Sequence, residues 1–182
     1  IKDFEAWLID ETDQKHEILK HGHGTLVELT QFTGVLPTHD ELLEKFAVEF
    51  GWYLAVHKEK RLYLNGRAVD VPKHEDFVQT ISADDEVFET QIIRWEQRPT
   101  SEKSYLYLLN SSGELVYKVL SSLNQKPNFF TSVCVKSSWA DTFSQEQDLF
   151  NSEAHTPGSP VWRKLKAQLD RLGQSVYDEF LR

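Results

Sequence analysis

The residues of this 182-residue chain that could perform chemistry are few, and their spacing rarely suits a reaction. His21 and His23 stand two apart before a predicted strand, so both imidazoles would share one face. Zinc needs at least a third protein ligand. The nearest further candidates, His16, His39 and Asp40, match no zinc-site spacing. The histidine pair is therefore not interpreted as a metal site.

Nucleophilic chemistry has no better support. The single cysteine, Cys134, lies in the apolar run 133–135, which predicts a buried, inert thiol and leaves no partner for a disulfide. The sequence has no Gly-x-Ser-x-Gly segment and no glycine-rich phosphate loop. We therefore do not expect this chain to be catalytic by itself.

Composition indicates a globular protein that is acidic, with 29 acidic and 20 basic residues and a net charge of −9. The segment 160–182 carries five basic and three acidic residues, so the remainder is more acidic still. Broad nucleic-acid binding is not expected from such a surface. No apolar run approaches the roughly 20 residues that span a bilayer, and no signal peptide is visible. The prediction is a cytoplasmic chain without membrane contact.

The chain begins at Ile1 and contains no methionine, which indicates a fragment of a longer protein. Its clearest early helix comes after Pro37 and extends to Val56, where Thr38 and Glu41 form a capping-box pattern. Its predicted buried stripe is Leu42, Leu43, Phe46, Ala47, Phe50, Tyr53 and Leu54. Gly51 within the helix indicates a close approach to a neighbouring strand.

The segment 61–71 is predicted to form a hairpin that turns at Asn65-Gly66 and stops at Pro72. Beyond it the apolar period becomes two, as in strands. The four predicted strands are 87–95, 105–109, 114–120 and 129–136. Polar connections between successive strands favour an antiparallel meander. Aromatic side chains concentrate in these strands, where half-buried pleated surfaces suit them.

Residues 144–160 are polar, contain two prolines and a glycine, and are predicted to be a loop or linker. A long amphipathic helix comes next over 161–182, with Ser159 as its cap and Pro160 at its first position. Its apolar stripe is formed by Trp162, Leu165, Leu169, Leu172, Val176 and Phe180. We expect this stripe to dock a downstream domain or a second subunit.

The order of elements in the first 72 residues resembles a known family. Gly24-Thr25 opens an alternating run to Thr30, and it is succeeded by the helix to Val56 and a strand ending at Asn65-Gly66. This order is similar to the end of the nucleotide-binding domain in the gyrase, heat-shock chaperone, histidine kinase and MutL (GHKL) superfamily of ATPases. In that family the threonine of the Gly-Thr pair lies beside the adenine. The resemblance therefore implies that Gly24 and Thr25 contact nucleotide.

The resemblance also implies a second domain after the ATPase domain. In the MutL and chaperone branches this is a transducer domain with a fold like domain 2 of ribosomal protein S5, and it supplies a cation that senses the terminal phosphate. Lys126 in the loop 124–127 is the corresponding candidate here, and a solvated turn lysine is the alternative. The family's Asp-x-Gly-x-Gly segment, glycine-rich lid and metal-binding asparagine are not in this sequence. ATP with Mg²⁺ is accordingly expected in the full-length protein only.

Together these observations predict an α+β fold, a sandwich in which a mixed, mostly antiparallel sheet packs on helices, with a long C-terminal helix. The expected parts are 1–72 (end of the ATPase domain), 73–143 (transducer-like sheet), 144–160 (linker) and 161–182 (helix). The expected function is to couple nucleotide state to a downstream domain or partner, within the same polypeptide or across a dimer. The alternative is a protein-interaction module with no nucleotide role.

Overall fold

A computed structural model describes residues 34–97, 104–145 and 155–182 of the chain. The chain divides into two compact units, and all of the helices and strands described here belong to the unit Thr38–Arg182. Gly24 and Thr25 lie outside the described residues, as do His21 and His23. The boundary after Pro37 falls within the predicted 1–72 part and groups its helix and hairpin with the sheet that comes after them.

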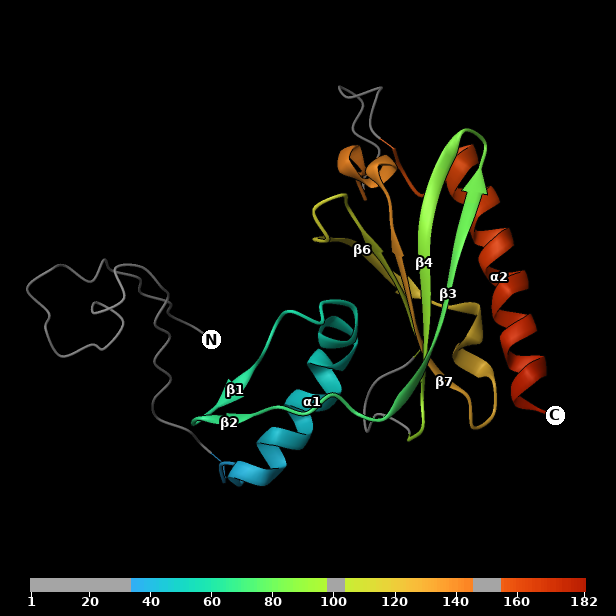
Figure 1. The fold of residues 1–182 in the computed structure, drawn as a ribbon. Coiled ribbons are helices and arrows are strands. Elements are labelled where there is room, and N and C mark those ends of the chain that lie inside the picture. The colour runs from blue at the N-terminus through green and yellow to red at the C-terminus, as the bar shows by residue number, and fades with distance from the viewer. Residues whose placement is uncertain (1–33, 98–103, 146–154) are drawn as a thin grey trace, which may run out of the picture. The chain divides into compact units, whose positions relative to one another are not determined.

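The fold is α+β and consists of two α-helices, a two-stranded sheet and a five-stranded mixed sheet in the described residues (Figure 1). The elements in chain order are α1 (His39–Val56), β1 (Tyr63–Leu64), β2 (Arg67–Ala68), β3 (His74–Ala83), β4 (Glu86–Trp95), β5 (Tyr105–Leu109), β6 (Leu115–Leu120), the 3₁₀ turn η2 (Ser122–Gln125), β7 (Phe130–Lys136), the 3₁₀ turn η3 (Ser138–Thr142) and α2 (Pro160–Phe180). The predicted fold class and long C-terminal helix are thus confirmed. None of the described helices has the length and apolarity to cross a membrane.

Local chemistry explains α1 and the hairpin after it. Thr38 and Glu41 make the predicted capping box at the start of α1. Asn65 and Gly66 both have positive φ, 50° and 79°, which is the turn geometry that joins two strands after a two-residue loop. Leu43 and Leu54 of α1 pack with Val69 beyond the hairpin to form a small apolar cluster. Phe50, which was predicted to lie in the buried stripe of α1, is instead exposed.

Substitutions at Thr38 measure how much the capping box contributes to the free energy of unfolding. Its hydroxyl accepts the Glu41 N–H (3.3 Å), and its own N–H donates to Glu41 Oε2 (2.7 Å). We expect Thr38→Ala to reduce the free energy of unfolding by about 1 kcal/mol, measured with urea, while Thr38→Ser keeps most of it. The backbone and side-chain hydrogen bonds from Thr38 lower the pKa of Glu41.

The lowered pKa of Glu41 gives the capping box a pH dependence with a definite sign. The carboxylate is stabilised in the folded state, so its contribution is present above the unfolded pKa and is lost as pH falls through the folded pKa. Thr38→Ala removes the hydroxyl, which also donates to Glu41 Oε2 (2.9 Å), but keeps the backbone N–H. The difference between Thr38→Ala and wild type should therefore shrink in acid only by the share that the hydroxyl contributes. A difference that stays constant from neutral pH to strong acid would show that the Thr38 hydroxyl does not stabilise the Glu41 carboxylate.

The strand order β3-β4-β7-β5-β6 corrects the predicted meander. β7 lies between β4, with which it is antiparallel, and β5, with which it is parallel. The reason is burial: five consecutive residues of β7 are buried, whereas β3 and β6 at the edges carry many exposed residues. A strand that is buried on both faces is stable only in the middle of a sheet. β3 itself was missed, because its pattern mixes charged and apolar residues.

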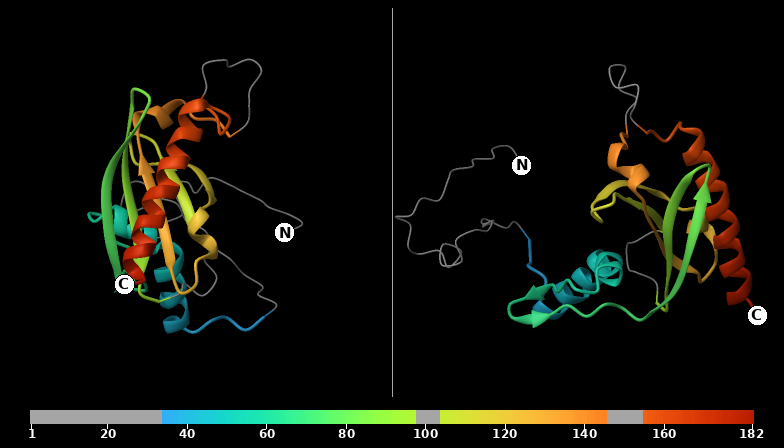
Figure 2. Two further views of the ribbon diagram at one scale, coloured as in Figure 1. Left: turned by 90° about the vertical axis from the view of Figure 1, so that its right-hand side faces the viewer. Right: turned by 45° about the horizontal axis from the view of Figure 1, so that its top comes forward.

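The two faces of the five-stranded sheet have different coverings. α2 lies along one face (Figure 2), where its buried residues join Phe88, Ile92, Leu106 and Leu108 in the main core. The opposite face carries Ile93, Trp95, Tyr107 and Cys134, against which α1 places Trp52 and Ala55. The alternation of tyrosine and leucine along β5 therefore serves two separate packing layers.

Ser159 occupies the predicted N-cap position of α2, with Pro160 in the first turn. Its hydroxyl accepts the N–H of Thr156, however, and makes no hydrogen bond to the helix. The N-cap position of Ser159 was therefore predicted correctly. The predicted hydrogen bond to the helix is absent, because the Ser159 hydroxyl accepts the Thr156 N–H of the preceding turn.

Candidate functional site

Lys126, the candidate phosphate sensor, comes directly after η2 and is held by α2. Its Nζ donates to Gln174 Oε1 (2.7 Å) and lies 4.8 Å from the centre of the Tyr177 ring. The cation therefore has one hydrogen bond and one cation–π contact within the unit. An ammonium group has three N–H donors, and Lys126 uses one of them on Gln174.

The apolar stripe of α2 packs against the chain's own sheet. Trp162, Leu165, Leu169 and Val176 are buried in the main core, and Leu172 packs partly against the same core. Phe180 is more exposed and contacts the Phe129 ring at 5.3 Å. Within the described residues, these side chains form the second layer of the sandwich.

A contact between α1 and the sheet joins the first elements of the unit to the rest. The Trp52 ring stacks on Tyr107, with centroids 4.0 Å apart and planes 15° apart. Next to Trp52, Gly51 packs against Pro72, because a Cβ there would stand 3.2 Å from Pro72 Cδ, and it would stand 3.5 Å from the Trp95 ring. The close approach predicted for Gly51 is therefore made to Pro72, which lies outside the strands, while its contact with Trp95 of β4 is of ordinary length. Trp52 was not included in the predicted buried stripe of α1. A tryptophan next to a glycine within a helix was the sequence signal that could have indicated this contact.

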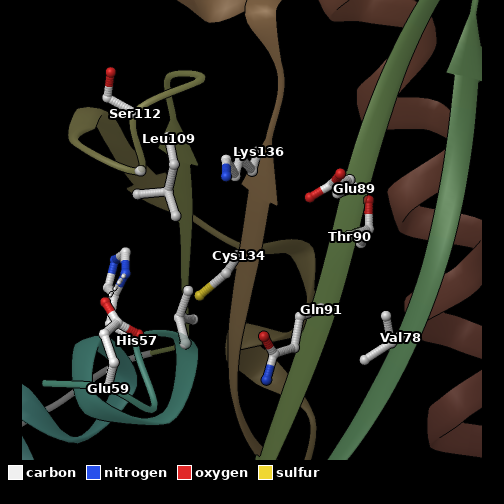
Figure 3. A pocket seen from close by; sticks show the side chains of 12 residues that line it. His57, Glu59, Val78, Glu89, Thr90, Gln91, Leu109, Ser112, Cys134 and Lys136 are labelled. Atoms are coloured by element: carbon white, nitrogen blue, oxygen red, sulfur yellow. Dashed lines mark ion pairs between the residues drawn. The ribbon is translucent and has the colours of Figure 1, made fainter.

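A pocket of about 450 Å³ lies on the same face of the sheet, next to the end of α1. Figure 3 shows its lining side chains, with His57 and Glu59 from the segment after α1. Val56 at the end of α1 also lines the pocket, and the other residues come from the strands and the β5–β6 turn. His57 Nδ1 stands 3.9 Å from Glu59 Oε1, and its buried Nε2 has no hydrogen-bond partner among the described residues. Glu89 of β4 and Lys136 of β7 are cross-strand neighbours at the other side of the pocket.

Two kinds of reactive group can be checked in this pocket, a metal-ligand cluster and an activated thiol. The described residues contain no group of three or more histidine, cysteine, aspartate or glutamate side chains that could hold a metal ion. Burial raises the pKa of the Cys134 thiol far above its usual range, so the thiol stays protonated and is not a nucleophile. The predicted inert cysteine is thereby confirmed.

The contact of His57 with Gly113 gives a testable steric prediction. Gly113 (φ +81°) and Gly66 (φ +79°) both need the left-handed region, but only at Gly113 would a Cβ meet another residue, His57 Cε1 at 2.9 Å. We expect Gly113→Ala to lower the free energy of unfolding by about 1 kcal/mol more than Gly66→Ala, in denaturant titrations. Equal losses would mean that the His57 ring moves aside freely.

No protein-family model, curated protein or solved structure matches this chain. Its function must therefore be inferred from the residues themselves, from the order of the elements and from the contacts between them.

Proposed function

We propose that this chain is the coupling part of a GHKL-type ATPase, in which nucleotide bound near Gly24-Thr25 changes the position of the sheet and α2. Support comes first from the order of elements, from the Gly-Thr pair through α1 to the Asn-Gly turn. In this proposal Thr25 lies beside the adenine, and the upstream part of the protein holds ATP and Mg²⁺. Lys126 exchanges Gln174 and Tyr177 for the terminal phosphate in one nucleotide state.

The observation that carries the proposal is the dual packing of α1. One side of the helix packs with the hairpin elements that complete the ATPase-like order, and Trp52 stacks on the sheet. The opposite face of that sheet is covered by α2. A displacement of α1 would be passed to α2 through packed side chains, provided that nucleotide favours one of two arrangements.

The experiment that tests this proposal is titration calorimetry with a non-hydrolysable ATP analogue. We expect the full-length protein to bind the analogue, Thr25→Ala to weaken that binding, and the chain 1–182 alone to show none. Hydrogen exchange on the full-length protein should then report nucleotide-dependent protection in α1 and β5. Absence of binding by the full-length protein would eliminate the proposal.

A second candidate function, a protein-interaction module without nucleotide, has one observation in its favour. Val78 of β3 and Val87 of β4 are 75% and 54% exposed on the hairpin that forms one edge of the sheet. Exposed apolar side chains on an edge strand suit pairing with a strand of another protein. If the full-length protein binds no nucleotide, this edge is the first surface to test for a protein partner.

A further inference from the structure

A second pocket, of about 350 Å³, lies beyond the end of α1 and differs in charge from most of the chain. It is lined by Leu54, Ala55, Lys58, Lys60, Arg61, Ala68, Val69, Asp70, Val71 and His74. Three permanent cations thus face one carboxylate, in a chain whose net charge is −9. Sequence reasoning missed this concentration, because Glu59 interrupts the basic run and His74 is distant in the chain.

Arg61 is held in a fixed orientation at this pocket. Its Nη1 donates to the carbonyl oxygens of Lys58 (2.5 Å) and Lys60 (2.8 Å), which uses both Nη1 hydrogens. Its Nε and Nη2 have no partner among the residues that the structure describes. Those two groups form the guanidinium edge that binds two oxygens of one phosphate through parallel hydrogen bonds.

Lys58 and Lys60 line the same pocket as Arg61 and have little neutralisation. Lys58 Nζ is 3.9 Å from Asp76 Oδ2 and largely exposed, and Lys60 makes no ion pair within residues 34–97, 104–145 and 155–182. The loop 58–61 carries these three cations and one carboxylate, Glu59, which stands 3.9 Å from His57 Nδ1. The mutual repulsion of the three cations is relieved by an anion placed between them.

We propose that this pocket binds a small molecule that carries a phosphate group on an apolar body. A phosphate has close to two negative charges and several acceptor oxygens, which suits a guanidinium edge with two lysines better than a single carboxylate does. The buried side chains of Leu54, Ala55 and Val69 form an apolar wall for the body of the ligand. This site uses other residues than Gly24 and Thr25, so the inference does not depend on the proposed ATPase function.

The test is an NMR titration of the chain 1–182 with phenyl phosphate and, separately, with inorganic phosphate. We expect saturable shifts of the backbone amides of 58–61 and 68–71, with phenyl phosphate binding about tenfold tighter because its ring adds apolar burial. Lys60→Gln should weaken binding about three- to tenfold through the lost charge. Arg61→Lys should weaken it at least as much, because the charge remains and the bidentate edge is lost.

The matched control is Lys136→Gln, which removes a cation of the chain outside this pocket and should leave the affinity within about twofold. Equal weakening by Lys136→Gln, or shifts confined to the basic part of α2, would mean that phosphate is attracted only by general charge and would overturn the proposal. Equal affinities for phenyl phosphate and inorganic phosphate would show that the ligand needs no apolar body, and would overturn that part of the proposal. Thr25→Ala should not change the affinity for either probe. A failure of the phosphate-pocket proposal can therefore be distinguished from a failure of the ATPase proposal.

Discussion

Replacing Leu165 with alanine is expected to lower the free energy of unfolding by about 3–4 kcal/mol, the largest stability loss predicted for this chain. Leu165 is completely buried within the main core, between α2 and the sheet. Alanine removes three carbon atoms from a closely packed layer and leaves a cavity, because strands and helix collapse only partly. Urea unfolding followed by tryptophan fluorescence measures the loss directly.

The Leu165 variant also decides between two uses of the α2 stripe. If the stripe served mainly to dock another domain or subunit, Leu165→Ala would weaken that association and leave the isolated chain almost as stable as before. The control is Leu181→Ala just after α2, where the side chain is 62% exposed and the expected loss is below about 0.5 kcal/mol. Similar losses for both variants would contradict the packing described here.

Replacing Trp52 with alanine is the second large effect, with an expected loss of about 2–4 kcal/mol. The indole is half-buried and stacks on Tyr107, which has no exposed surface. Since this stack is the main aromatic contact between α1 and the sheet, its removal should loosen α1 more than α2. Hydrogen exchange should therefore show a greater loss of protection in α1 than in α2.

Phe50→Ala provides the matched control on the same helix. Phe50 is 42% exposed and makes an edge contact with Phe46 within α1, so its loss should cost about 1 kcal/mol or less. In the full-length protein, Trp52→Ala should preserve binding of the ATP analogue while it abolishes the nucleotide-dependent protection of β5. Unchanged protection of β5 in that variant would show that the coupling does not pass through Trp52.

Local elements were well predicted where a few neighbouring residues determine the structure. The capping box at Thr38 and Glu41, the Asn65-Gly66 turn and four strands of the large sheet result from chemistry within short segments. Strand β3 was missed, because it alternates irregularly between apolar and polar residues at the edge of the sheet. Its pairing with β4, and not its own pattern, makes it a strand.

The candidate sites were less accessible to sequence reasoning, because they depend on residues that are distant along the chain. The predicted role of Lys126 was based on its place in a loop, whereas its actual neighbours, Gln174 and Tyr177, come from a helix about 50 residues later. The pocket for which we propose a phosphate ligand combines the loop after α1 with His74 of β3. Charge counted over continuous segments does not detect such a combination.

By itself, the sequence of this protein determined its elements: where helices begin, where turns occur and which residues are apolar on each face. These properties depend on backbone preferences and on periodicities of two and 3.6 residues, which are local. Only the tertiary structure decided that β7 lies between β4 and β5, that the α2 stripe faces the chain's own sheet, and that Trp52 joins α1 to Tyr107. Those outcomes depend on which apolar surfaces bury one another, and that choice is settled by the packing of the whole unit.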